Sequence, residues 1–249
     1  LDYGFGVAVD MYGSVFVSGR TFSRDLPRAV NKYAGTSDAF VAKLSVNGLV
    51  EWCLYVGGGD KEVPEDIAVH GDKVYVTGVT DSSSLMGESS GYHSRNSYLV
   101  VIDGATGKAL RVVLISGVSD ETSAKIVVRG SSLIVMGDTW SEGLTPQGSW
   151  HVVNPKPPSG VKKEHLHTTW VQKVKKTFVG FFDLNGNFRE GYLLIDPFYM
   201  SAENAFTEWD GAIVVCGVTF GSPTRLASEA RDNETPGAPR SAWSTLDST

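Results

Sequence analysis

One short sequence pattern occurs four times in this chain of 249 residues. It reads apolar-x-apolar-x-Gly-x-Thr, and its glycines are Gly19, Gly78, Gly137 and Gly217, spaced 59, 59 and 80 residues apart. Alternating apolar residues predict β-strands. A period of this length, built from strands, predicts an array of small sheets. The pattern therefore predicts an all-β fold, with a β-propeller as the expected architecture.

Each unit is expected to form a four-stranded antiparallel meander. In the first unit, Asn47-Gly48 lies between two β-rich runs, and this dipeptide favours a type I′ hairpin turn because both residues tolerate a positive φ. The first three units predict strands over residues 6–10, 15–21, 38–44, 49–56, 66–70, 74–80, 97–103, 109–116, 125–129, 133–139, 177–184 and 188–195. The fourth unit predicts strands over 205–209, 213–219 and 241–246 and lacks an outermost strand.

The units define approximate blades over residues 1–60, 61–120, 121–200 and 201–249 of a single array. A small four-stranded sheet cannot bury both of its faces alone, so the blades must stack around an axis. Either the ring closes in another way, for example by self-association, or the chain is part of a larger propeller. Because propellers usually have four to eight blades, we favour the larger propeller.

Composition excludes several classes of protein. The formal net charge of −6 gives no overall attraction to nucleic acid or to anionic lipid. The longest apolar runs, such as 98–102 and 212–216, are far shorter than the roughly 20 residues of a membrane span, so we expect a soluble chain without a transmembrane segment. The two cysteines, Cys53 and Cys216, lie in predicted strands and are expected to be buried and free.

The first unit resembles the SBBP family of β-propeller repeats. The matching residues are Asp10, Gly13, 15–19, Thr21, Ser23, Asp25-Leu26-Pro27, 38–44, Trp52 and Gly57-Gly58. The resemblance is specific over about the first 60 residues and weakens in the later units. It implies a large exported protein of a bacterial or archaeal surface, located extracellularly or on the cell, without a common catalytic activity. It implies no site residues.

Long loops are expected on one face of the array, over residues 22–37, 81–96, 140–176 and 220–240. Long loops on one side of a rigid scaffold usually carry recognition, and the alternative is that they only cover the disc. The third unit carries an insertion over 152–176, and from His151 to Lys176 there are six lysines and one acid. This basic loop would dock on an acidic partner or on acidic neighbours in its own chain, although a solvated charged loop is the commoner meaning.

Three kinds of ligand site are considered on these loops and on the links between blades. Three imidazoles in the third unit would bind zinc or another transition metal, or else are exposed loop histidines: His151, His165 and His167. Aromatic rings would stack on a sugar, or else pack against their own loops: Trp140, Trp150, Trp170 and Tyr92. Acids on the links would bind calcium, but solvated links are favoured: Asp60, Glu62, Glu65, Asp66, Asp120 and Glu121. Trp52, in an outer strand, is expected to pack between blades.

Two functions follow from this reading. The first is a non-enzymatic propeller scaffold of an exported or surface protein, which binds a protein or glycan through its long-loop face. The alternative is a carbohydrate-active propeller, a hydrolase or lyase, with its active site at the axial funnel. An enzyme should place acids or histidines repeatedly at the ends of the innermost strands, and these positions carry a mixture such as Tyr3, Glu65 and Lys125. The sequence thus favours binding over catalysis without deciding it, and it indicates no cofactor.

Overall fold

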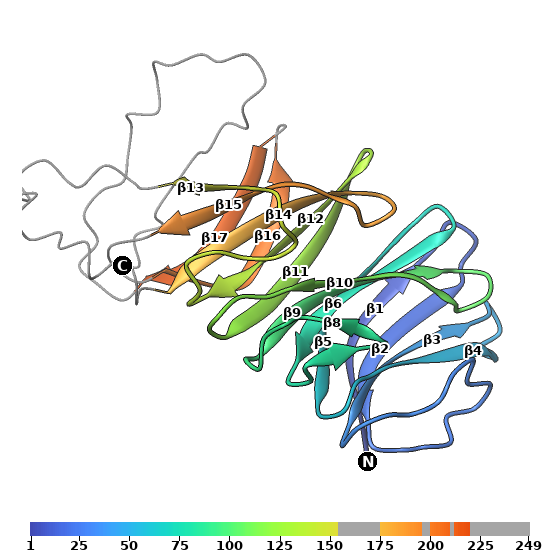
Figure 1. Cartoon of the computed structure of the whole chain (residues 1–249). Coiled ribbons are helices and arrows are strands. Elements are labelled where there is room, and N and C mark those ends of the chain that lie inside the picture. The colour runs from blue at the N-terminus through green and yellow to red at the C-terminus, as the bar shows by residue number, and fades with distance from the viewer. Residues whose placement is uncertain (154–174, 196–199, 210–211, 220–249) are drawn as a thin grey trace, which may run out of the picture.

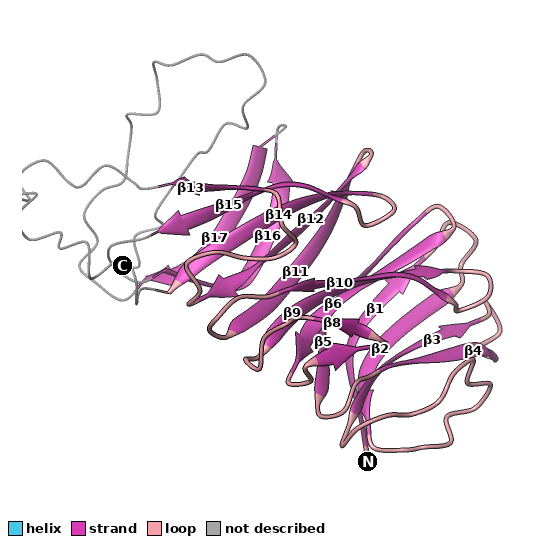
Figure 2. Ribbon diagram, in the orientation of Figure 1, coloured by secondary structure: helices cyan, strands magenta, loops and turns pink. Residues whose placement is uncertain are grey.

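A computed structural model describes residues 1–153, 175–195, 200–209 and 212–219. These residues form strands, turns and loops (Figure 2). The fold is therefore all-β, as the repeated strand pattern predicts. Within the described ranges there is no helix long and apolar enough to cross a membrane.

The described strands form three large sheets, antiparallel except for one added strand, and two two-stranded hairpins (Figure 1). Sheet 1 contains β1 (Asp2–Val9), β2 (Val15–Thr21), β3 (Asp38–Leu44) and β4 (Val50–Val56), in that order. Sheet 2 contains β5 (Glu62–His70), β6 (Lys73–Thr80), β9 (Asn96–Asp103) and β10 (Ala109–Ile115), in that order. Sheet 3 contains β11 (Glu121–Arg129), β12 (Ser132–Thr139), β14 (Lys176–Asp183) and β15 (Phe188–Ile195), with β13 (Ser149–Val153) added in parallel beside β15. Sheet 4 contains β16 (Met200–Trp209) and β17 (Ala212–Thr219), and a small hairpin contains β7 (Ser84–Leu85) and β8 (Glu88–Ser89).

The meander strands occur where the sequence predicts them, with one systematic difference. The first strand of each unit begins earlier than expected, at Asp2, Glu62, Glu121 and Met200. In each case the register shifts opposite the repeated glycine, for example between Pro64 and Asp66, so a β-bulge carries the pairing further. The prediction of loops over 81–96 and 140–153 is wrong in part, because β7, β8 and β13 lie there. The strand expected over 241–246 lies outside the described residues.

The hairpin at Asn47-Gly48 is present, but the predicted type I′ turn is wrong. Gly48 has a φ of 75°, whereas Asn47 does not have a positive φ. Gly48 N–H donates to Ser45 O at 2.8 Å, and Ser45 N–H donates to Leu49 O at 2.9 Å. The register then shifts after Lys43, so the turn needs one left-handed residue and a bulge in place of two left-handed residues.

The repeated glycine makes room for an aromatic ring. Gly78 pairs with Tyr98 on the neighbouring strand β9. A Cβ at Gly78 would lie 2.2 Å from Val63 O and 2.3 Å from the Tyr98 hydroxyl oxygen. Gly19 beside Phe40 and Gly137 beside Phe178 repeat this arrangement. The glycine of the repeat is therefore required by close backbone and ring approach.

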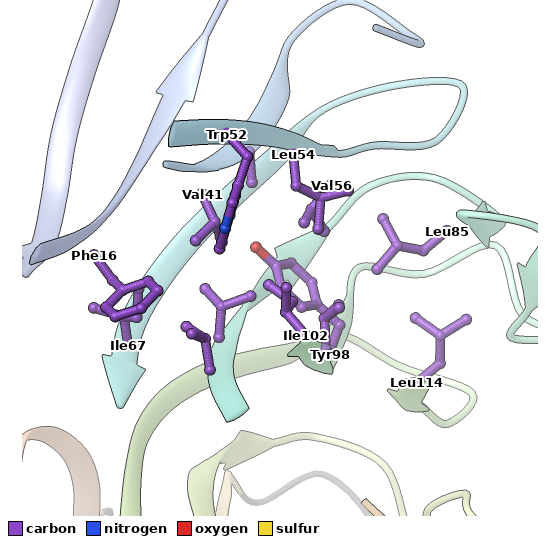
Figure 3. Close-up of a cluster of buried hydrophobic side chains, with 14 residues drawn as sticks. Phe16, Val41, Trp52, Leu54, Val56, Ile67, Leu85, Tyr98, Ile102 and Leu114 are labelled. Carbon is purple, nitrogen blue, oxygen red and sulfur yellow. The ribbon is translucent and has the colours of Figure 1, made fainter. Parts of the chain in front are cut away.

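The sheets follow one another in sequence order and pack face to face (Figure 1). Their first strands adjoin: β1 lies beside β5, β5 beside β11, and β11 beside β16. The core between sheets 1 and 2 contains Phe16, Val41, Trp52 and Leu54 of sheet 1 and Val74, Val76, Tyr98, Val100 and Ile102 of sheet 2 (Figure 3).

Trp52 confirms the expectation of packing between units. Its side chain is buried in this core, and its Nε1–H donates to Gly104 O of the next unit at 3.2 Å. Cys53, on the same strand, is buried and free, as expected. A second core, which includes Tyr75, Leu99 and Phe178, joins sheets 2 and 3 in the same way.

Candidate functional site

A buried carboxyl group lies where sheet 1 passes into sheet 2. Glu62 Oε1 accepts hydrogen bonds from the Thr80 hydroxyl at 2.7 Å and from the Ser82 hydroxyl at 2.6 Å. Its Oε2 accepts from Gly58 N–H at 3.1 Å, and the Ser82 oxygen accepts from Asp60 N–H at 2.7 Å. We call this set of groups the acid–hydroxyl cluster. It ties the link between two sheets to the second strand of the later sheet.

The same cluster recurs in sheet 3. Glu121 Oε1 accepts from the hydroxyls of Thr139 at 2.8 Å and Ser141 at 2.6 Å, and Oε2 accepts from Gly117 N–H at 3.0 Å. Ser119 N–H donates to the Ser141 oxygen at 2.9 Å. Glu62 and Glu121 are both fully buried, so the prediction of solvated links is wrong for these two acids.

Sheet 1 carries a more exposed form of the cluster. There, the hydroxyls of Thr21 and Ser23 donate to the carboxylate of Asp2. The signal in the sequence is a Thr-x-Ser after the repeated glycine and an acid 18 or 19 residues before the threonine. In the fourth unit Gly221 stands at the position of the serine, so the Thr-x-Ser signal is absent from the sequence there.

Burial changes the acidity of both buried carboxyl groups. It raises the pKa of Glu62, and it raises the pKa of Glu121 to about 7, while the hydroxyl and amide hydrogen bonds oppose the change. The larger cause is desolvation, because neither side chain touches water. Glu121 is therefore poised to hold a proton near neutral pH.

A third buried carboxyl group, Asp38, lies at the start of β3. Its Oδ2 accepts from Ala34 N–H at 2.7 Å, and its Oδ1 has no hydrogen-bond partner in the described protein. Burial raises the pKa of Asp38 to about 7, and the nearby charge of Glu62 adds to the rise. A Cβ at Gly57 would lie 2.3 Å from the carboxyl group, so this glycine is needed for Asp38 to fit.

The position of Asp38 differs chemically between units. The equivalent residue is Asn96 in sheet 2 and Lys176 in sheet 3, each paired with the threonine of the repeat. Lys176 Nζ donates to Ser141 O at 3.2 Å. An acid, an amide and an amine thus occupy the same buried position in three successive sheets. The three units therefore differ in side-chain chemistry at this position, although their backbones are alike.

An open hollow of about 380 Å³ lies outside Asp38, where loops of the first two units meet. It is lined by Asn31, Lys32, Ala34, Gly57, Gly58, Gly59, Ser84, Met86 and Gly87. Met86 N–H donates to Gly57 O at 3.0 Å, which joins the second unit's loop to the link. Lys32 is exposed at the rim and supplies a positive charge. The hollow has the size for a small ligand or for a projecting side chain of a partner.

The hollow has a rigid wall on the side of sheet 1. The amide group of Asn31 donates to Tyr55 O at 2.8 Å and accepts from Tyr55 N–H at 2.8 Å. Val30 N–H donates to Cys53 O at 2.8 Å. These bonds fix the 28–31 segment along β4.

The predicted aromatic residues do not form one platform in the described part of the chain. Trp150 is half-buried and stacks on Phe188 with ring centroids 5.0 Å apart, and its Nε1–H donates to Pro146 O at 3.1 Å. Trp140 is half-buried, with Lys175 Nζ 5.2 Å from its ring centroid. Tyr92 is half-buried in the loop of the second unit. Trp170 lies outside the described residues, and the sugar-binding role of these residues stays a prediction.

The predicted histidine group is described only at His151. This side chain is exposed on β13, with Nε2 4.0 Å from Glu190 Oε2 and its ring 5.3 Å from that of Tyr192. His165 and His167, with most of the 152–176 basic loop, lie outside the described residues. The described ranges contain no group of three histidine, cysteine or acidic side chains placed to hold a metal ion.

The described long loops fold back toward the outer strands of their sheets. Ala29 bridges to Cys53 on β4, β13 pairs with β15, and β8 lies near β10. They therefore cover sheet edges, and the hollow is formed between them.

Comparisons with known proteins do not assign a family. No protein-family model matches the chain, and no curated protein matches it. Two structures of apocarotenoid oxygenase variants from Synechocystis align with 77% of this chain, at 8% and 10% sequence identity and TM-scores of 0.37 and 0.36. The chain spans 38% of the length of each of these structures. A likeness at this level identifies neither a family nor an activity.

Proposed function

We propose that this chain is part of an SBBP-type β-propeller, which serves as a non-enzymatic scaffold of an exported or surface protein and binds a protein or glycan partner on its long-loop face. The observation that carries the proposal is the hollow between the loops of the first two units, set on a rigid stack of repeated sheets. Binding sites on repeat scaffolds typically lie where loops of neighbouring units meet.

The arrangement of the sheets supports the propeller. In each of the first three sheets, the chain begins at a strand that adjoins the first strand of the next sheet. It then steps outward through the following strands. A radial array of blades requires that the first strands of successive units lie next to one another near the axis. It also requires that the later strands of each unit lie progressively further out.

The chemistry of the buried acids supports a scaffold more than an enzyme. Glu62 and Glu121 have the same hydroxyl and amide partners in two successive sheets. A catalytic acid is needed once, whereas a structural contact is useful in every unit. The raised pKa values in this chain thus accompany repeated packing, which also perturbs pKa values.

A glycan array, followed by titration of each hit, tests the proposal. Gly59 lines the hollow, and a Cβ added there has no atom within 4 Å, so we expect the ring of Gly59→Tyr to occupy part of the hollow. Val46→Tyr, in an exposed turn at the other end of sheet 1, is the matched control. We expect Gly59→Tyr to weaken ligand binding at least about tenfold and Val46→Tyr to leave it unchanged.

If Gly59→Tyr binds the ligand as tightly as the wild type does, the hollow is not the binding site. An array without any hit would remove the glycan, and cleavage of a glycan by the purified chain would replace the scaffold with a carbohydrate-active enzyme.

A further inference from the structure

One face of sheet 1 is apolar and is not covered by another sheet. Register places Val7 opposite Val17 and Val9 opposite Val15, and Val17 lies opposite Ala42 on β3. Directly opposed residues share a face of a sheet. Val7 is 66% exposed and Val9 is 60% exposed. We call the accessible part of this surface the open face of sheet 1; it contains Val7, Val9, Val15, Val17, Phe40 and Leu44. Toward β4 the same face is buried, at Ala42, Cys53 and Tyr55.

The same face is buried in the next two sheets. Ile67 has the position of Val7, and it is 6% exposed in the core between sheets 1 and 2. Val76, Tyr98 and Val100 belong to the same face of sheet 2 and are fully buried there. The equivalent residues of sheet 3 lie in the core between sheets 2 and 3: Ile126, Leu133, Val135, Phe178 and Phe182. Each is covered by the sheet that precedes it in the sequence.

The covering surfaces are also alike. Sheet 1 covers sheet 2 with Phe16, Val41, Trp52 and Leu54, and sheet 2 covers sheet 3 with Tyr75, Leu99, Val101 and Val113. The covering sheet thus presents an aromatic residue on its second strand and branched aliphatic residues on its third and fourth strands, and sheet 1 adds Trp52 on its fourth strand. The open face of sheet 1 is therefore equivalent to the faces of sheets 2 and 3 that a preceding sheet covers.

Sheet 4 of the same chain does not cover the open face. Figure 1 places β16 and β17 at the opposite end of the described stack, against sheet 3. In contrast, each covering sheet is joined to the sheet that it covers by five residues, 57–61 in one case and 116–120 in the other. The rule of this stack is that a sheet is covered by the unit directly before it.

We propose that the open face of sheet 1 is an interface for one further four-stranded sheet of the same repeat type, which directly precedes sheet 1 in a longer polypeptide. This sheet presents an aromatic and branched aliphatic face like those of sheets 1 and 2. The proposal concerns a different surface from the long-loop face and does not depend on what that face binds.

The test extends the full chain by one unit. Because Lys61 and Leu1 occupy equivalent positions just before the clustered acid, residues 61–119 are fused directly before Leu1. We expect the extended chain to unfold cooperatively, with a melting temperature at least about 5 °C higher than that of the original chain.

Two substitutions locate the new contact. Val7→Asp should lower the melting temperature by less than about 1 °C in the original chain and by more than about 5 °C in the extended chain, where it buries a charge. Met11→Asp is the control, because Met11 is 86% exposed in the turn after β1 and should have a small effect in both chains.

Three outcomes would overturn the proposal. One is an equal effect of Val7→Asp in both chains. Another is that neither this extended chain nor a second one, with residues 2–60 fused before Leu1, folds. The third is a stable dimer of the original chain in sedimentation experiments that Val7→Asp dissociates, because the open face would then be an interface for a second copy.

Discussion

Replacing Gly78 by alanine should destabilise the protein far more than a single methyl group usually does. The added Cβ would lie 2.2 Å from Val63 O, 2.3 Å from the Tyr98 hydroxyl oxygen and 2.5 Å from Tyr98 Cζ. Ordinary contacts begin near 3.4 Å, so β5 and the Tyr98 ring would each have to move by about 1 Å. Tyr98 and its neighbour Val76 are fully buried in the core shared with sheet 1, which leaves no space for that movement.

Overpacking of a core usually costs about 1–3 kcal/mol. Because a backbone oxygen and a ring are both involved at Gly78, we expect a cost of about 3 kcal/mol, at the upper end of that range. In a chain of this size such a cost lowers the melting temperature by about 6–12 °C. Thermal unfolding followed by circular dichroism, together with a urea titration, measures both quantities.

Gly4→Ala is the matched control, because Gly4 also lies in a strand and has no atom within 4 Å of the added Cβ. We expect its effect to stay within about 0.5 kcal/mol. Adding Tyr98→Leu to Gly78→Ala removes the ring overlap but leaves the Val63 carbonyl overlap, so the double variant should not regain the stability of Tyr98→Leu alone. The reasoning is refuted if Gly78→Ala unfolds within about 1 kcal/mol of the wild type.

Two further predictions concern the acid–hydroxyl cluster. Because burial raises the pKa of Glu121 from 4.5 to about 7, the folded protein holds this proton more tightly than the unfolded chain, and the stabilisation is lost as the pH rises through 7. For Glu121 alone this amounts to about 3 kcal/mol between pH 4 and pH 8, so melting temperatures that stay constant or rise over this range would contradict it. Ser141→Ala removes a donor to Glu121 and the acceptor of Ser119 N–H and should cost about 1–3 kcal/mol in urea unfolding. Ser131→Ala, in an exposed turn, should leave the free energy of unfolding almost unchanged. Equal urea midpoints for Ser141→Ala and Ser131→Ala would show that the cluster does not stabilise the fold.

Local patterns in the sequence were sufficient to predict most strands. Alternation around Gly19, Gly78 and Gly137 predicts β2, β6 and β12, and turn residues place their partners. The bulges that lengthen β5 and β11 could not be predicted, because they depend on contacts across the sheet. β13 could not be predicted either, because it pairs in parallel with a strand about 40 residues later in the sequence.

The candidate site is less visible in the sequence than the fold is. Asp38 and Gly57 meet because β3 pairs with β4, and Met86 of the second unit joins them only because sheets 1 and 2 stack. Glu62 stands among charged residues that suggest a solvated link, yet hydroxyl groups 18 and 20 residues later bury it. The ligand sites expected at the aromatic and histidine residues of the third unit remain predictions, because Trp170, His165 and His167 lie outside the described residues.

The loops that lie along the outer strands also limit how such a protein can assemble. Residues near Ala29 occupy hydrogen-bonding positions along β4, and β13 occupies the edge of β15. Strand edges that are already paired cannot recruit a foreign strand, which is the usual route to β-aggregation. Lengthening through sheet faces stays open, while lateral growth at the edges of β4 and β15 is blocked. Tandem copies of this unit can therefore accumulate in one polypeptide at a low risk of fibre formation.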